Sequence, residues 1–263
     1  MKPVNSTRRE FFAILGIATS LLMLPLSVLA ATWNKVAFDA EKLGDAEKKL
    51  EINGEIPSND ISVIAPDRAE NGAIVQVEIA ANIPNVEAIA IFVEKNPTPL
   101  IANVMLAKGA QAKLTTRIKM AETSDIKVIV KADGKYYSAS KNVQVLENGC
   151  GGGGGVSEKF ESSMKLRAKL NGNITEIKAI IIHPMHTGRA KDDFGSVIPA
   201  HFIQVADLML NGQYVFQMQW GTGIAKNPYL TCYVDNAKVG DKVRLTWHDN
   251  LGKTGTGEIE VTA

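Results

Sequence analysis

The sequence predicts an all-β protein of two immunoglobulin-like β-sandwich domains, which are joined by a glycine-rich arm and preceded by a short helix in the first domain. Along most of the 263 residues, apolar and polar side chains alternate with a period of two, which is typical of half-buried strands. Turn signals separate these runs at short intervals, and no strand–helix–strand spacing indicates a parallel sheet. Each half has the size of an ordinary domain.

The one predicted helix lies near the start of the first domain. Leu43, Ala46 and Leu50 recur at helical spacing among charged residues. The pattern runs from Phe38 to Leu50, although Gly44 weakens it. We therefore expect a short amphipathic helix here and strands in the rest of both domains.

Strands and tight turns follow this helix. Residues 75–79 alternate between the two faces of a predicted strand, and residues 191–193 indicate a solvated hairpin tip. Asx-Gly pairs favour the left-handed backbone of tight hairpins. Two such hairpins are predicted: Asp133-Gly134 follows residues 126–131, and Asn211-Gly212 joins His201–Leu210 to Gln213–Trp220.

Between the two domains, Cys150 stands in a run of glycines. The run consists of Gly149, Gly151, Gly152, Gly153, Gly154 and Gly155. Glycine has no Cβ and loses more entropy on ordering than any other residue, so these six residues are predicted to give the arm its flexibility. An extended arm that begins near Val145 carries the thiol up to about 17 Å from its anchor, at ~3.3–3.6 Å per residue. The alternative is a flexible linker in which Cys150 is incidental.

The first thirty residues have the features of a twin-arginine signal peptide. Arg8 and Arg9 precede the apolar run Ala13–Leu29, and residues 28–30 form a small-residue cleavage signal. An uncleaved membrane anchor is the alternative, but the run is short for a span. We therefore predict a periplasmic protein with four segments: a signal peptide at residues 1–30, a first domain at 31–147, an arm at 148–155 and a second domain at 156–263.

Charge and motif content exclude several functions. Without Lys2, Arg8, Arg9 and Glu10, the 29 basic and 28 acidic residues become 26 and 27. A nearly neutral chain does not favour nucleic acid or an anionic membrane as a partner. Nucleophile-elbow, P-loop, paired-cysteine and HExxH motifs are absent from the sequence, so we predict no catalytic site and no cofactor.

The two cysteines have different predicted roles. Cys232 shares a strand face with Leu230 and Val234, which predicts a buried, inert thiol. Glu147 is the charge nearest to Cys150 in the sequence, so this thiol is expected to be activated by other proteins rather than to act as a catalytic nucleophile. A Cys150–Cys232 disulfide would pin the arm and remains an alternative. Disulfide-linked homodimers through Cys150 are also expected.

A metal site is a competing interpretation of the second half. His183, Met185 and His186 lie close together, and His201 and His248 follow. Imidazole and thioether groups suit copper, so a periplasmic metallochaperone is an alternative function. A proline interrupts the first group, however, and His248 is on a polar strand face. We therefore predict no metal site.

Several motifs resemble one known family. Residues up to Cys150 are similar to SoxY, the carrier protein of thiosulfate oxidation, and residues from Val156 are similar to its partner SoxZ. The segments similar to SoxY are Ala65–Ala73, Val93–Pro97, Arg117–Ala121 and Lys131–Lys135. The segments similar to SoxZ are His183–Gly188, Ile198–Phe202 and Lys226–Tyr229.

This resemblance implies a sulfur carrier, with Cys150 as the attachment site for covalent sulfur adducts and no further cofactor. The implied partners are a SoxXA-like haem c protein that loads thiosulfate, a SoxB-like hydrolase that releases sulfate and a SoxCD-like molybdenum–haem dehydrogenase that oxidises the remaining sulfur. The SoxZ-like domain would be a docking scaffold in cis. A related group of carriers, associated with quinoprotein dehydrogenases, makes a different cargo the alternative.

Three features depart from the family. Asn148 stands where the family has glycine, and His186 replaces the usual acidic residue. In the family the arm is a free C-terminus, whereas here it continues into the second domain. A structural module of two β-sandwiches therefore remains a further alternative.

Overall fold

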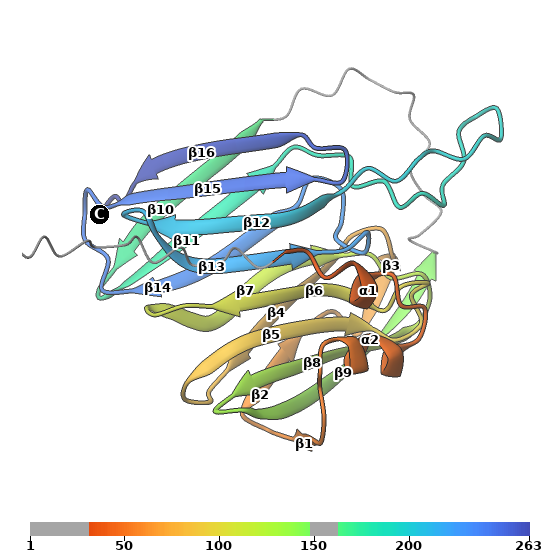
Figure 1. The fold of residues 1–263 in the computed structure, drawn as a ribbon, viewed down its shortest axis with the longest axis horizontal. Coiled ribbons are helices and arrows are strands. Elements are labelled where there is room, and N and C mark those ends of the chain that lie inside the picture. The colour runs from red at the N-terminus through yellow and green to blue at the C-terminus, as the bar shows by residue number, and fades with distance from the viewer. Residues whose placement is uncertain (1–31, 148–162) are drawn as a thin grey trace, which may run out of the picture. The chain divides into compact units, whose positions relative to one another are not determined.

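The computed structural model describes residues 32–147 and 163–263, named here the first half and the second half (Figure 1). Within the first half, the elements are α1 (Lys35–Phe38), α2 (Leu43–Lys49), β1 (Glu55–Pro57), β2 (Ile61–Ile64), β3 (Arg68–Asn71), β4 (Val75–Ala81), β5 (Val86–Val93), β6 (Leu100–Leu106), β7 (Ala110–Ile118), β8 (Ser124–Ala132) and β9 (Lys135–Glu147). Within the second half, they are β10 (Met164–Asn171), β11 (Ile174–Ile181), β12 (Ile203–Leu210), β13 (Gln213–Trp220), β14 (Tyr229–Asp235), β15 (Lys242–Asp249) and β16 (Thr254–Glu260). The predicted all-β class, with a little helix near the start, is confirmed.

The predicted helix is shorter than its sequence pattern. Helix α2 occupies Leu43–Lys49 and includes Gly44, as predicted. The prediction of one continuous helix from Phe38 to Leu50 was wrong: Phe38 ends the separate helix α1, the chain turns at residues 39–42, and α2 ends one residue before Leu50. The Phe38 ring stacks on Trp33, with ring centroids 5.2 Å apart, so packing decides this boundary. Among the described residues, no helix is long and apolar enough to cross a membrane.

Both predicted Asx-Gly hairpins are confirmed. Asp133 and Gly134 have φ values of 48° and 70° between β8 and β9. Asn211 and Gly212, between β12 and β13, have φ values of 50° and 79°. Two successive residues of positive φ form the turn whose twist matches that of the flanking strands. The local sequence therefore determines these two connections.

The strands form two sheets, and each sheet contains strands from both halves of the described chain. The ten-stranded sheet has the order β1-β9-β8-β5-β6-β13-β12-β15-β16, with β3 pairing to β9 off this path. The six-stranded sheet has the order β10-β11-β14-β7-β4-β2. The two sandwich domains predicted from the sequence are therefore continuous with each other through their sheets.

The core is also shared. One cluster of buried side chains includes Val77 and Leu114 of the first half together with Ile177 and Trp220 of the second half. Consistent with this, the described residues form one compact unit. The halves are joined by hydrophobic burial and hydrogen bonds, in addition to the polypeptide between them.

A long hairpin-like loop projects from the second half between β11 and β12 (Figure 1). The finger, defined here as residues 186–201, is closed at its base by a backbone bridge between His186 and His201. A second bridge joins Lys191 and Val197 near its tip. The predicted solvated hairpin tip at residues 191–193 lies at the end of this finger.

Candidate functional site

The junction between the halves, named here the seam, is made of two antiparallel strand pairs. In the larger sheet β6 pairs with β13, with Ala102 opposite Trp220. In the smaller sheet β7 pairs with β14, with Leu114 opposite Cys232. Without the second half, β6 and β7 would be sheet edges with unpaired N–H and C=O groups. The seam therefore satisfies the backbone hydrogen bonds of both halves.

A glycine-containing loop after β13 packs closely against the first half. A Cβ on Gly221 would lie 2.9 Å from both the carbonyl oxygen of Leu100 and the Phe38 ring. A Cβ on Gly223 would overlap the side chain of Ile101. Only glycine permits this close approach. Gly221 and Gly223 therefore serve packing at the seam.

A buried lysine connects the halves beside this loop. Lys119 of the first half is 7% exposed, and its Nζ donates hydrogen bonds to the carbonyl oxygens of Met185 at 2.5 Å and Thr222 at 3.0 Å. Its backbone N–H donates to the carbonyl oxygen of Gly223 at 2.7 Å. A buried ammonium group is costly unless it is hydrogen-bonded. These bonds therefore determine how the loops of the second half sit on the first half.

The N-terminal segment also contacts the seam, at the end of β13 in the larger sheet. Trp33 donates a hydrogen bond from its Nε1 to the carbonyl oxygen of Trp220, at 2.9 Å. The Trp33 ring also contacts Phe202, the residue directly after the finger, with centroids 5.6 Å apart. Gln219 accepts a hydrogen bond from the backbone of Asn34 at 3.2 Å. The segment that follows the predicted cleavage site thus belongs to the folded unit.

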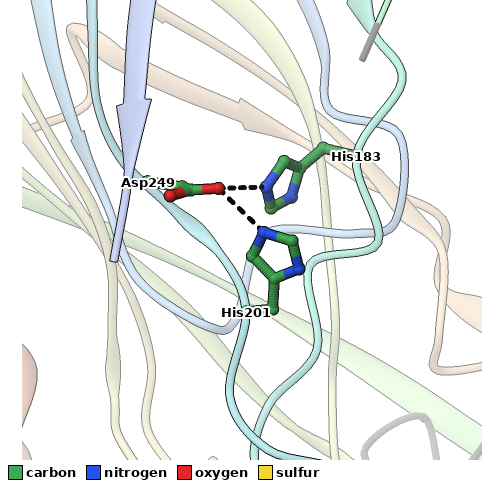
Figure 2. A group of neighbouring side chains, drawn as sticks. All are labelled: His183, His201 and Asp249. Carbon is green, nitrogen blue, oxygen red and sulfur yellow. Dashed lines mark hydrogen bonds and ion pairs between the residues drawn. The ribbon is translucent and has the colours of Figure 1, made fainter. Parts of the chain in front are cut away.

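Three titratable side chains meet at the base of the finger (Figure 2). Asp249, at the end of β15, places its Oδ2 2.8 Å from Nε2 of His201 and 3.4 Å from Nε2 of His183. Its Oδ1 accepts hydrogen bonds from the backbone N–H groups of Leu251 and Lys253, at 2.9 and 2.8 Å. The carboxylate is completely buried and holds three separate segments together.

The hydrogen bonds define the tautomer of His183. Its Nδ1 accepts a hydrogen bond from the backbone N–H of Met185 at 3.2 Å, so the ring proton of the neutral imidazole lies on Nε2 and points to Asp249. The three ligand atoms lie within 4.8 Å of one another, a spacing that could suit a metal ion. A neutral His183 bound to a metal through Nε2 would need its proton on Nδ1, facing the Met185 donor. The arrangement therefore favours a hydrogen-bonded cluster over a metal site.

The electrostatics agree with this assignment. Burial lowers the pKa of His183 from 6.5 to about 4, although its contact with Asp249 opposes the shift. Burial alone would raise the pKa of Asp249, but hydrogen bonds from His201, His183 and the two backbone N–H groups lower it overall. At neutral pH the cluster therefore contains an ionised carboxylate and a neutral His183.

Of the predicted copper group, His201 meets His183 at Asp249, and Met185, His186 and His248 have contacts of their own. The Met185 sulfur accepts a hydrogen bond from the backbone N–H of Ile203 at 3.4 Å. His248 is exposed on β15, as its position on a polar strand face predicted. His186 bridges to His201 through the backbone, and burial together with nearby positive charges lowers the pKa of its side chain. The prediction that there is no metal site stays a prediction.

Cys232 lies where the sequence predicted. It is 1% exposed in β14, among the core residues that include Leu230 and Val234, and it is a free thiol. Burial raises the pKa of this thiol, so it has little thiolate at neutral pH.

The predicted attachment site and arm lie outside the described residues. This applies to Cys150 and to the arm glycines Gly149, Gly151, Gly152, Gly153, Gly154 and Gly155. The structure therefore tests neither the attachment role of the cysteine nor the flexibility expected from the glycines. Both stay predictions.

The residues on either side of the undescribed segment 148–162 are connected by hydrogen bonds to residues near the seam and the finger base. The carbonyl oxygen of Glu147 accepts a hydrogen bond from Gly72 at 2.9 Å, and Met120, next to Lys119, donates to the carbonyl oxygen of Gly72 at 2.7 Å. At the other end, Ser163 accepts a hydrogen bond from Ile182 at 2.8 Å, one residue before His183. Both ends are thus linked by short paths to the segment at 182–186.

Two family models match the chain, one in each half. The model for "Sulfur oxidation protein SoxY" matches residues 48–150, and the model for "Sulphur oxidation protein SoxZ" matches residues 164–260. The chain is a SoxY–SoxZ fusion. The first half is therefore named the SoxY half and the second half the SoxZ half. No curated protein matches the chain.

Solved structures include two similar chains. The sulfur carrier protein SoxY from Chlorobium limicola f thiosulfatophilum is 36% identical, covers 40% of this chain and 96% of its own, and has a TM-score of 0.37. A superoxide reductase (neelaredoxin) from Ignicoccus hospitalis is 15% identical, covers 33% of this chain and 80% of its own, and has a TM-score of 0.29. The assignment as a SoxY–SoxZ fusion rests on the two family models.

Sequence reasoning missed three residues of the seam and the finger base. Asp249 was not singled out, although it ends a strand and begins a turn, which is a signal for a side chain that caps backbone N–H groups. Lys119 stands between Ile118 and Met120, but this alternation is equally typical of a lysine on the solvent face of a strand, so the local sequence carried no signal for its burial. Trp33 had no signal either, because its partners in the SoxZ half, Trp220 and Phe202, are distant in the sequence.

Proposed function

We propose that this chain is a periplasmic carrier protein that holds sulfur intermediates derived from thiosulfate on Cys150 and has no catalytic site of its own. The observation that carries the proposal is the extent of the SoxY match, which ends at Cys150 as its last residue. The other cysteine supports it, because a buried Cys232 with a raised pKa is unsuited to carrying cargo.

The chemistry requires electron acceptors and water from outside the carrier. The thiolate of Cys150 and thiosulfate together lose two electrons to a haem c protein of the SoxXA kind, and a sulfur–sulfur bond forms between them. A hydrolase of the SoxB kind then adds one water and releases the terminal sulfonate group as sulfate, which leaves a persulfide on Cys150. A dehydrogenase of the SoxCD kind oxidises that remaining sulfur atom to a sulfonate. In this step the added oxygen atoms come from water and the electrons pass to an external acceptor.

The seam supports a carrier whose two halves act as one body. Both sheets and a buried cluster cross from the SoxY half to the SoxZ half, so partners meet a single continuous surface. In this proposal the SoxZ half provides a docking surface in cis. The cargo is attached between the halves, in the segment whose two ends are linked to the seam and the finger base.

Intact-mass measurement of the protein from cells given thiosulfate tests the proposal. We expect mass increments for added S2O3 or added sulfur, which map to Cys150 and disappear on treatment with a reductant. Under native conditions an alkylating reagent should modify Cys150 quickly and Cys232 only after unfolding. The Cys150→Ser variant is the control and should carry no increment. Unmodified Cys150 during active thiosulfate oxidation, or equal labelling of both cysteines, would contradict the proposal.

A further inference from the structure

The tip of the finger presents apolar side chains to solvent. Phe194 is 93% exposed, the highest value of any large apolar residue that the structure describes, and Val197 nearby is 56% exposed. Exposed aromatic side chains are a typical feature of protein–protein contacts. A tip of this kind would otherwise be expected to carry only polar residues.

The tip is ordered rather than loose. The Oδ1 atom of Asp192 accepts hydrogen bonds from the backbone N–H groups of Phe194 and Ser196, at 2.9 and 2.8 Å. The backbone of Asp192 also donates to Ser196 and accepts from Gly195, at 2.9 and 3.0 Å. Asp192 therefore takes part in each of these hydrogen bonds, and the backbone that carries Phe194 has a defined conformation. Ordering before contact reduces the entropy lost on binding.

The base of the finger is ordered by a different set of contacts. Gly188 lies so close to Ala200 that a Cβ there would be 3.1 Å from the alanine Cβ. Asn250, next to Asp249, donates a hydrogen bond to the carbonyl oxygen of Ala200 at 2.9 Å. His201 is bonded to the buried Asp249. The finger is thus connected firmly to the body of the SoxZ half.

The two residues that flank the segment containing Cys150 are connected by hydrogen bonds to residues that precede the finger. That segment leaves the described chain at Glu147, which is linked through Gly72 and Met120 to the neighbouring Lys119 and so to the start of the finger. It returns at Ser163, which is hydrogen-bonded to Ile182. Both ends therefore lead to the residues directly before the finger. Under the carrier proposal, a protein that binds Cys150 engages a segment whose two flanking residues are connected by hydrogen bonds to residues 182–186.

We propose that the finger is a docking element, and that Phe194 inserts into a shallow apolar pocket beside the opening through which a partner enzyme receives the Cys150 adduct. This inference rests on the proposed carrier function. The partner's pocket is expected to have a mixed polar rim, because Arg189, Lys191 and Asp193 surround the apolar tip with charges of both signs. Such a contact holds the carrier body in place while the arm is engaged.

The test measures sulfate release by a purified SoxB-like hydrolase from carrier loaded with tetrathionate. In that loading, the Cys150 thiolate attacks a central sulfur of tetrathionate, forms the S-thiosulfonate and releases thiosulfate. Phe194→Ser should raise the KM for the carrier about tenfold, as expected when an apolar anchor is lost, and leave kcat within about twofold. Phe194→Leu should restore most of the affinity.

Val239→Ser is the matched control. Val239 is 59% exposed and lies before the start of β15, whereas the finger base is bonded to the end of that strand. It should leave KM unchanged. An equal KM for wild type and Phe194→Ser would overturn the finger proposal. The proposal would also be overturned if Phe194→Ser converted a wild-type dimer into a monomer and KM did not change.

The failure of the underlying function gives a different result. If loaded wild type releases no sulfate, or if Cys150→Ser treated with tetrathionate releases as much, then the carrier proposal is wrong. A photo-crosslinking residue at position 194 provides an independent measurement. It should crosslink to the hydrolase, whereas the same residue at position 239 should not. Crosslinking from both positions equally would contradict a specific role for the finger.

Discussion

The base and the tip of the finger are stabilised in opposite ways. At the base, Asp249 is completely buried and accepts hydrogen bonds from two imidazole rings and two backbone N–H groups. At the tip, Asp192 accepts from two backbone N–H groups, while the Phe194 side chain remains 93% exposed. Each end of the finger depends on one aspartate, but only the aspartate at the base has its carboxylate buried away from water.

This difference separates stability from recognition. Removing either the buried carboxylate or its hydrogen-bond partners lowers the free energy of unfolding by several kcal/mol. The groups that remain are buried and cannot bond to water instead. An exposed turn loses much less, because water replaces the missing bonds. We therefore expect changes at the base to affect the folding of the SoxZ half, and changes at the tip to affect partner binding.

The largest expected effect comes from removing the carboxylate at the base. Asp249→Ala should lower the free energy of unfolding by about 3–5 kcal/mol, because His183, His201 and the two backbone donors lose their acceptor. Urea denaturation at pH 7.5 measures this change. Asp249→Asn retains one acceptor oxygen and should lie between the alanine variant and wild type. A loss smaller than about 1 kcal/mol for Asp249→Ala would show that the cluster is not a main determinant of stability.

A smaller effect is expected from acidification of the same cluster. The pKa of His183 is lowered from 6.5 to about 4, so the fold favours its neutral form. The unfolded chain then binds more protons between these values, and stability is complete above pH 6.5 and falls as the pH decreases towards 4. The loss attributable to this one group is about 3 kcal/mol, at ~1.4 kcal/mol per pH unit.

Denaturation midpoints measured at intervals from pH 7.5 to pH 4 test this dependence. His183→Gln should be less stable at neutral pH but should show a flatter profile over this range, because the titrating group is absent. Parallel profiles for the variant and wild type would mean that other groups account for the acid sensitivity.

The smallest effect on stability is expected at the tip. Asp192→Ala should cost no more than about 1 kcal/mol, since the turn is exposed. Amide exchange at Phe194 and Ser196 should nevertheless become faster, because their N–H groups lose the Asp192 acceptor. Asp193→Ala is the matched control for charge and position. If both variants exchange like wild type, the tip is ordered by something other than the Asp192 side chain.

Much of the local structure was predictable from the sequence because short-range rules determine it. The turns at Asp133-Gly134 and Asn211-Gly212 follow from the few residues that accept positive φ. The burial of Cys232 follows from its alternation with apolar neighbours on one strand face. The helix was predicted less well, since its pattern begins at Phe38, whereas Phe38 packs on Trp33 and α2 begins only at Leu43.

The sequence by itself therefore determined the strand content, the tight turns, the inert cysteine and, through its family motifs, the SoxY–SoxZ order. Only the tertiary structure decided that both sheets cross the seam, that Lys119 bonds to the SoxZ half, and that Asp249 lies between two histidines 66 and 48 residues away. The physical reason is the distance along the chain over which each interaction acts. Alternation and turn chemistry act between neighbouring residues, whereas strand pairing and buried hydrogen bonds between distant segments depend on the register and packing of the whole fold.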